Sequence, residues 1–304
     1  MTRGETVKLN EKSELMNLFH SYMHKFYNKR DLFVIKQNTY SFFRYLIDRY
    51  RLSFKQLFSN IRRSSDVVQQ KYEGIWDQME WSELLPSHSS EHLIRWMDKY
   101  YLGNVWALSR VHLALLEKII DHYKPERVLE VGSGRGLNLI LLAARFPEIK
   151  FAGLELSESG VRWSSKVDSD PDLPPELTRY APFTWNGPRI PGTVQFVQGT
   201  ATKLPFADRH FDLVYTRQAL EQMEPYREQV FSEINRVCNR IGVFIEAFRD
   251  WNNTGTCRNR IIAKDYFAAR ISDLQKYGFE PVLFRNDLPT KTYMNVGLVI
   301  AQKQ

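Results

Sequence analysis

The fold is decided by one stretch of the chain, Val128-Leu129-Glu130-Val131-Gly132-Ser133-Gly134-Arg135-Gly136. A mostly apolar strand pattern runs directly into three glycines at alternate positions, and an apolar helical pattern follows over 137–145. Glycine permits the tight turn between strand and helix and lets a ligand approach the backbone closely. The stretch therefore predicts a nucleotide-binding β-α unit of an open sheet.

The glycine spacing separates two kinds of nucleotide site. A dinucleotide-binding loop follows the pattern Gly-x-Gly-x-x-Gly, and the place of its third glycine is taken here by Leu137. An acid, Glu155, ends the next apolar run 19 residues after Gly136. Both kinds of fold put an acid near this distance to bind a ribose, so Glu155 indicates a nucleoside site without identifying the nucleoside. The glycine spacing favours a ligand other than a dinucleotide.

The rest of the C-terminal two thirds alternates between strand and helix patterns. After a helical stripe over 105–120, apolar runs occur at 127–131, 150–156, 193–198, 211–216, 241–248, 281–285 and 293–301. This alternation predicts an α/β fold with a Rossmann-like, seven-stranded, mostly parallel sheet. Residues 170–192 interrupt it with six of the 13 prolines, which predicts an ordered loop or insertion, either a lid or a surface excursion.

The N-terminal part differs in composition. Residues 21–65 contain ten Lys or Arg against two acids, and eleven aromatic residues without any Gly or Pro. Apolar side chains recur at helical spacing, at Leu15, Phe19, Tyr22 and Phe26 and again within 42–50. The sequence predicts two or three amphipathic helices here, the third of them beginning at Ser53.

Four motifs in order resemble those of class I S-adenosylmethionine-dependent methyltransferases with a type 11-like domain. The glycine stretch is similar to the first motif, 151–157 to the second strand, 198–206 to the adenine-contacting turn and 211–216 to the fourth strand. The resemblance implies S-adenosylmethionine as the cofactor. It implies these cofactor-binding residues: Glu130, Gly132, Ser133, Gly134, Gly136, Glu155, Leu156, Thr200, Ala201 and Thr216.

Two positions depart from the family pattern. Thr200 stands where the family commonly has an Asp that binds the adenine amino group, and Gln222 stands where it often has a His. Because Gln cannot exchange protons near neutral pH, any general base must come from elsewhere. The catalytic residue is left open among four candidates: Tyr215, Gln218, Glu221 and Glu246. Glu221 is alternatively a structural acid, and Glu246 is either paired within the sheet or directed into the pocket.

The resemblance also implies the domain organisation and the activity. We expect a helical N-terminal region over 1–100, acting as a lid or in substrate binding, and a class I methyltransferase domain over 101–304. The expected reaction is in-line methyl transfer to a small or medium-sized acceptor, such as a metabolite, a sugar or a lipid-linked intermediate. The alternative is an RNA-binding methyltransferase or a non-catalytic adaptor that uses the basic N-terminal helices.

Composition limits the remaining classes. The chain has 304 residues with a formal net charge of +7, and its two cysteines exclude a disulfide framework or a four-thiolate zinc site. His20 and His24 share a helix face without an accompanying acid, so no metal site is expected. No apolar run is long enough to span a bilayer, and the first 30 residues lack a secretory pattern, so a cytoplasmic location is expected. The oligomeric state stays open.

Overall fold

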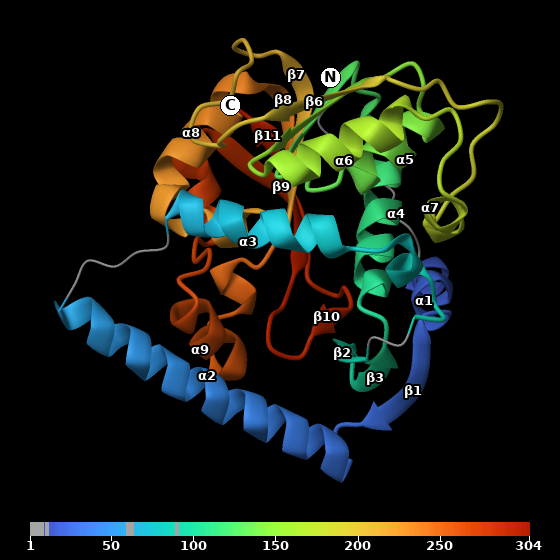
Figure 1. Ribbon diagram of the computed structural model, residues 1–304. Helices are drawn as coiled ribbons and strands as arrows, with labels where there is room; N and C mark the ends of the chain where they lie inside the picture. The colour runs from blue at the N-terminus through green and yellow to red at the C-terminus, as the bar shows by residue number, and fades with distance from the viewer. Residues whose placement is uncertain (1–8, 10–11, 59–63, 89–90) are drawn as a thin grey trace.

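The computed structural model describes residue 9 and residues 12–58, 64–88 and 91–304. Its central element is a seven-stranded sheet with the order β6-β5-β4-β7-β8-β11-β9 (Figure 1). The strands are β4 (Arg127–Val131), β5 (Lys150–Glu155), β6 (Val194–Gln198), β7 (Phe211–Arg217), β8 (Cys238–Glu246), β9 (Phe279–Arg285) and β11 (Gly297–Lys303). The first five strands of this order pair in parallel, and β11 is antiparallel to both neighbours. The predicted α/β class and mostly parallel sheet are confirmed.

Helices cover both faces of the sheet because successive side chains of each strand point to opposite faces. Val128 and Leu213 belong to the core on the side of α4, α5 and α6, whereas their neighbours Leu129 and Val214 pack on the side of α8 and η5. These helices are α4 (Trp106–Tyr123), α5 (Leu137–Arg145), α6 (Glu158–Ser169), α8 (Arg227–Val237) and η5 (Ile271–Tyr277). Cys238 begins β8 and is buried.

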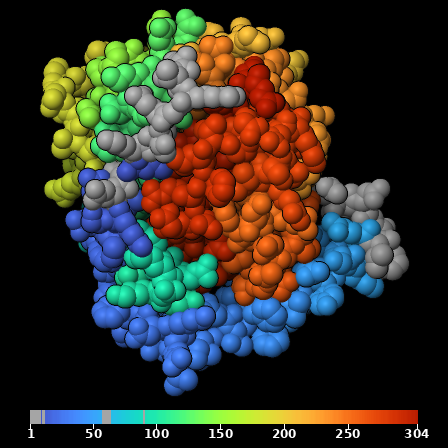
Figure 2. Space-filling view, turned by 180° about the vertical axis from the view of Figure 1, so that it is seen from behind, coloured from blue at the N-terminus to red at the C-terminus, as the bar shows by residue number. Residues whose placement is uncertain are grey.

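A second sheet joins the two ends of the chain. Its order is β1-β3-β2-β10, and all its pairs are antiparallel. The strands are β1 (Met23–Asn28), β2 (His92–Trp96), β3 (Lys99–Gly103) and β10 (Thr290–Lys291). From behind, the segment of β2 and β3 lies beside the C-terminal residues (Figure 2). The expected boundary between residues 100 and 101 falls inside β3.

The N-terminal region is therefore not purely helical, and this part of the sequence-based prediction is wrong. Phe26 lies in β1, and Tyr22 follows the end of α1 (Lys12–His20). The error arises because β1 is held by its long-range pairing with β3, and the spacing of its aromatic residues happens to match a helix.

Two further α-helices, α2 and α3, lie in the described part of this region. α2 (Leu32–Phe58) runs through Ser53 without a break, so the helix expected to begin there is part of α2. α3 (Ser65–Gln78) begins after Ser64, whose hydroxyl accepts a hydrogen bond from the Val67 N–H. α3 packs against α6, and α2 lies along α9 (Gly255–Ala263) at the edge of the molecule (Figure 1). Within the described segments, no helix combines the length and the apolar character needed to cross a membrane.

The proline-rich segment is ordered and contains a short helix, α7 (Pro175–Tyr180). Asp168 and Arg189 form a nearly buried ion pair across its base, and the Asp168 carboxylate also accepts the Val194 N–H at 3.0 Å. The segment brings Tyr180 into the wall of the cavity described below. Residues 170–192 are thus an insertion that contributes to a site.

Candidate active site

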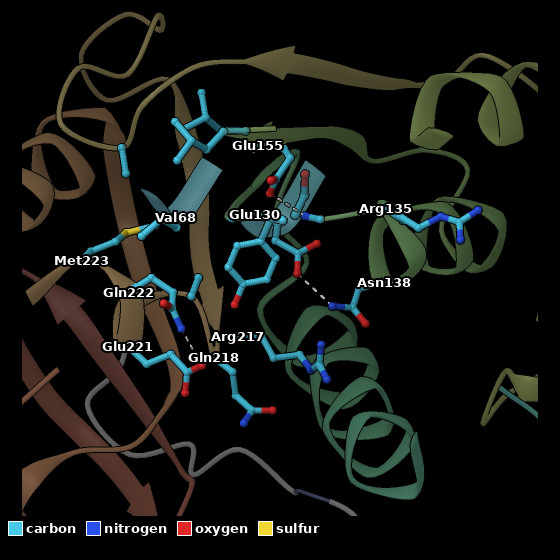
Figure 3. Close-up of a pocket in the computed structure, with 18 of the residues that line it drawn as sticks. Val68, Glu130, Arg135, Asn138, Glu155, Arg217, Gln218, Glu221, Gln222 and Met223 are labelled. Atoms are coloured by element: carbon cyan, nitrogen blue, oxygen red, sulfur yellow. Dashed lines mark hydrogen bonds between the residues drawn. The ribbon is translucent and has the colours of Figure 1, made fainter. Parts of the chain in front are cut away.

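A cavity of about 340 Å³ lies at the carboxyl ends of β4, β5 and β7 (Figure 3). The loops that follow these strands form most of its wall, and α3 closes it with Ser65, Val68, Tyr72 and Trp76. Open α/β sheets bind ligands at this edge. The segment over 59–63, which precedes α3, lies outside the described residues.

The glycine loop turns the chain with positive φ angles of 81° at Gly132, 55° at Gly134 and 68° at Gly136. A Cβ atom on Gly134 would lie 2.8 Å from the Trp76 ring. The glycines are therefore required by backbone conformation and by the protein groups that pack against them, in addition to any ligand contact. Gly132 and Gly134 line the cavity as expected, whereas Gly136 precedes α5 and is not part of the wall.

Glu155 links the glycine loop to the end of β5. Its Oε2 accepts the Gly134 N–H at 2.8 Å, and its Oε1 accepts the backbone N–H of Ser157 at 3.0 Å and the Ser157 hydroxyl at 2.7 Å. A carboxylate has about four acceptor positions. Glu155 is 7% exposed and lines the cavity, so it keeps acceptor capacity for a ligand hydroxyl while it fixes the loop.

The expected adenine turn also reaches the cavity. Leu156, Thr200 and Ala201 line it. The Thr200 hydroxyl lies 2.9 Å from that of Thr202 and accepts the Thr202 N–H at 3.3 Å, so it stabilises the turn. Thr216, also expected to bind the cofactor, is fully buried and is not part of the cavity wall.

On the side of the glycine loop, two wall atoms that can accept a hydrogen bond have no partner within the described part of the chain. They are Oε2 of Glu130 and the hydroxyl of Ser133. The other oxygen of Glu130 accepts the Asn138 amide at 2.8 Å. Burial raises the pKa of Glu130 to about 7. A cationic or N–H group of a ligand would satisfy both atoms and favour the ionised form of Glu130.

Two of the four catalytic candidates lie outside the cavity wall. Tyr215 is fully buried, and burial together with the adjacent Glu130 raises the pKa of its hydroxyl well above the ordinary value. Glu246 is also buried, and its Oε1 accepts the N–H groups of Ala219 at 3.0 Å and Leu220 at 3.2 Å. Burial raises the pKa of Glu246 to about 8. Glu246 therefore holds the segment after β7 in place and does not line the cavity.

The other two candidates, Gln218 and Glu221, line the cavity (Figure 3). Gln218 has a φ of 50°, and its N–H donates to the Ile245 carbonyl at 2.9 Å, which turns its side chain out of the sheet. Glu221 accepts the Gln222 amide at 2.9 Å through Oε1, and its Oε2 has no partner within the described segments. Burial raises the pKa of Glu221, against the opposing influence of Arg260, Gln222 and Lys291.

Sequence patterns missed Lys291 and the residues of α3 that close the cavity. Arg217 and Lys291 line the cavity; burial lowers the pKa of Lys291 despite the nearby Glu221. Lys291 comes from β10, and no local motif marks it. Arg135 joins the glycine loop to the end of α3, because its guanidinium donates to the Met79 carbonyl at 2.6 Å. The guanidinium also lies 4.4 Å from the Trp81 ring centre and 4.5 Å from that of Trp163.

Comparison with known proteins identifies the central segment. Residues 129–245 match the family model described as a methyltransferase domain. By this match, the segment is a methyltransferase domain. The methyltransferase domain thus contains the glycine loop, Glu155 and the turn after β7, as the resemblance of the motifs implied.

The methyltransferase domain has distant relatives. The fatty-acid O-methyltransferase of Mycolicibacterium smegmatis is 28% identical over 120 residues, which are 40% of this chain and 36% of that protein. The chain thus matches only about a third of that relative's length. Among solved structures, the cyclase SpnF has a TM-score of 0.51 at 17% identity, covering 80% of this chain and 97% of its own. Magnesium protoporphyrin IX methyltransferase from Synechocystis has a TM-score of 0.51 at 12% identity, covering 79% and 99%. These likenesses to solved structures support the fold alone. The type of reaction has to be inferred from the residues of the site.

Proposed function

We propose that the protein is an S-adenosylmethionine-dependent methyltransferase whose acceptor is a small or medium-sized molecule enclosed in the cavity. The observation that carries this proposal is that one cavity contains two sets of groups. The glycine loop and Glu155 form one side; Arg217, at the end of β7, and Gln218 and Glu221, in the turn after it, form the other set. A nucleoside cofactor and an acceptor could therefore meet there.

The residues around the glycine loop fit the cofactor. Glu155 would bind the ribose hydroxyls through its remaining acceptor capacity, and Oε2 of Glu130 would pair with the ammonium group of the methionine part. Leu156 and Ala201 would flank the adenine. When bound, S-adenosylmethionine supplies a methyl carbon that its sulfonium makes electrophilic.

The residues of the chain would position the acceptor and exclude water from the cavity. Trp76 and Tyr72 of α3 line the cavity on the side opposite the sheet, where they would exclude water. Glu246 fixes the turn that carries Gln218 and Glu221 through its two backbone hydrogen bonds. Holding an acceptor in line with the methyl group accounts for much of the rate in a bimolecular transfer.

The charges near this turn favour an acceptor with a carboxylate. Arg217 and Lys291 both line the cavity, against Glu221, whose raised pKa keeps it neutral at a higher pH than an ordinary glutamate. A carboxylate is ionised near neutral pH and needs no general base, which agrees with Gln at position 222. The activity of the Mycolicibacterium relative, on a fatty acid, supports the same acceptor class.

The test is methyl transfer by the full chain from methyl-labelled S-adenosylmethionine. Separate reactions would contain fatty acids of several lengths, a hydroxylated metabolite, a sugar and RNA. We expect label in a base-labile ester of a carboxylic acid, and a Lys291→Met variant with a KM raised about tenfold for that acid, since a charge-assisted contact is lost. Label in RNA would support the RNA-binding alternative. Cofactor binding without transfer to any acceptor would support a non-catalytic role.

A further inference from the structure

The helix α2 exposes an apolar stripe to solvent, the reverse of the usual arrangement in a surface helix. Tyr40, Phe43, Ile47, Tyr50 and Phe54 follow one another at spacings of 3 or 4 residues and therefore share one face. Their exposed fractions lie between 50% and 66%. An apolar patch of this length on a protein surface marks an interaction site. We call this side of the helix the outer face of α2.

The opposite side of α2 is fixed to the molecule largely by polar contacts with α9. The Arg49 guanidinium donates to the Asn259 amide oxygen at 3.0 Å, and Lys264 lies 3.4 Å from the Asp48 carboxylate. Tyr45 is buried, and its hydroxyl accepts from Arg260 at 2.8 Å. These contacts determine which side of the helix faces outward. In Figure 1, α2 lies along the margin of the molecule, with α9 on its inner side.

The outer face also carries positive charge. Lys36, Arg44, Arg51 and Lys55 are exposed on α2. Asp48 is the single acid in the sequence of this helix, and it pairs with Lys264. The adjoining strand β1 adds Phe26, which is 67% exposed, and the exposed Lys25. The surface thus combines exposed aromatic and basic side chains, and in Figure 2 the blue N-terminal residues lie along the margin of the molecule.

We propose that the outer face of α2 docks the protein on the surface of an anionic lipid bilayer. The helix would lie in the plane of the interface, with its apolar stripe among the upper acyl chains and its Lys and Arg side chains at the headgroups. Aromatic rings are favoured at this depth. α2 does not qualify as a spanning helix, in agreement with an interfacial position.

Charge and side-chain type favour this occupant over two others. Pairing of two copies through α2 would bring Lys36 and Arg44 of each copy together. Asp48 is the single acid of the helix, and it already lies 3.4 Å from Lys264 and 3.9 Å from Arg51. Single-stranded nucleic acid binds by stacking bases on aromatic rings, whereas the outer side of α2 also exposes aliphatic groups that cannot stack, namely Leu32, Ile35 and Ile47. A bilayer uses the aliphatic, aromatic and basic groups together.

The experiment is co-sedimentation of the full chain with vesicles of phosphatidylcholine alone or mixed with phosphatidylglycerol. We expect binding to the anionic vesicles, weakened by salt, and roughly tenfold weaker binding for Ile47→Glu because it puts a charge into the acyl region. The matched control is Ile190→Glu, since Ile190 is 56% exposed, against 50% for Ile47, and lies outside α2. It should bind like the unsubstituted protein. Thermal unfolding should be unchanged in both variants, which shows that they are folded.

Three results would overturn the proposal. The first is equal sedimentation with neutral and anionic vesicles, or none with either. The second is unchanged binding of the folded Ile47→Glu variant. The third is a dimer in light scattering that Ile47→Glu converts to a monomer while vesicle binding persists, which would assign the outer face to a second copy. None of these results depends on methyl transfer, so the docking surface and the proposed function fail separately.

Discussion

The backbone N–H of Gly134 donates a 2.8 Å hydrogen bond to the carboxylate of Glu155. Glu155 thus performs two tasks: it shapes the glycine loop through this bond, and it also lines the cavity. Its replacement should therefore affect the stability of the fold and cofactor binding together.

Glu155→Ala removes the acceptor of Gly134 and Ser157 and the ribose contact. Lost hydrogen bonds to a charged group cost about 1.5–3 kcal/mol, so we expect S-adenosylmethionine affinity to fall roughly ten- to a hundredfold in calorimetry. Glu158→Ala, at an exposed acid three positions later, is the control and should bind normally. Unchanged affinity in folded Glu155→Ala protein would contradict our location of the ribose.

Gly134→Ala tests the contact between the glycine loop and Trp76. Its methyl group would meet the indole ring at 2.8 Å, and the alanine would also occupy a φ of 55°. The control is Gly255→Ala, where φ is 59° and no atom lies within 4 Å of the added Cβ. We expect a loss of about 1 kcal/mol for the control, from backbone strain alone, and about 2–3 kcal/mol for Gly134→Ala. In urea unfolding, the double variant Gly134→Ala/Trp76→Ala should lose less stability than the sum of the two single losses, because the clash with the ring is absent. Strict additivity would show that the ring moves aside without cost.

Glu221→Gln tests the charge beside the acceptor. Burial raises the pKa of Glu221 above 4.5, so its carboxyl group is an anion above that raised pKa and neutral below it. The KM of the unsubstituted enzyme for a carboxylate acceptor should therefore fall as the pH drops through this pKa while the acceptor stays ionised. Glu221→Gln should have a KM roughly fivefold lower at alkaline pH, without this pH dependence, since one like charge is removed.

The control for this measurement is Glu228→Gln, which lies on α8 and bonds to Tyr277 outside the cavity. A different result would change the role of Glu221. If Glu221→Gln abolished kcat and left KM unchanged, Glu221 would be the general base and the acceptor would not be a carboxylate.

Glu73→Gln tests how α3 is held over the cavity. The Glu73 carboxylate accepts the N–H groups of Glu158 at 2.6 Å and Ser159 at 2.8 Å, so it caps α6 from another helix. Burial opposes ionisation, but these hydrogen bonds outweigh it and the pKa of Glu73 is lowered from 4.5. The stabilisation is present above pH 4.5 and is lost as the pH falls through the lowered value. We expect Glu73→Gln to cost about 1 kcal/mol at pH 7 and less at pH 3, compared by denaturant unfolding. An equal loss at both pH values would show that the charge of Glu73 does not matter.

The central sheet could be predicted because its signals are local. The glycine stretch and the strand patterns around it depend on neighbouring residues, and eight of the ten expected cofactor-binding positions line the cavity. Gly136 and Thr216 do not, because the motif identifies a segment without fixing the direction of each side chain. Lys291 and Trp76 were missed for another reason. They reach the cavity through long-range packing of β10 and α3, and no residue type or spacing near them encodes that contact.

β10 pairs with β2, and Trp96 donates from its indole N–H to the Asp287 carbonyl at 2.7 Å, so the first and last parts of the chain share one sheet. Evolution could not readily exchange the N-terminal hundred residues by recombination at a single crossover. A chimera that took its N-terminal hundred residues from a relative would also have to take the 286–296 segment from that relative. That segment includes Lys291 of the cavity wall. The two distant segments are therefore expected to diverge as one hereditary unit.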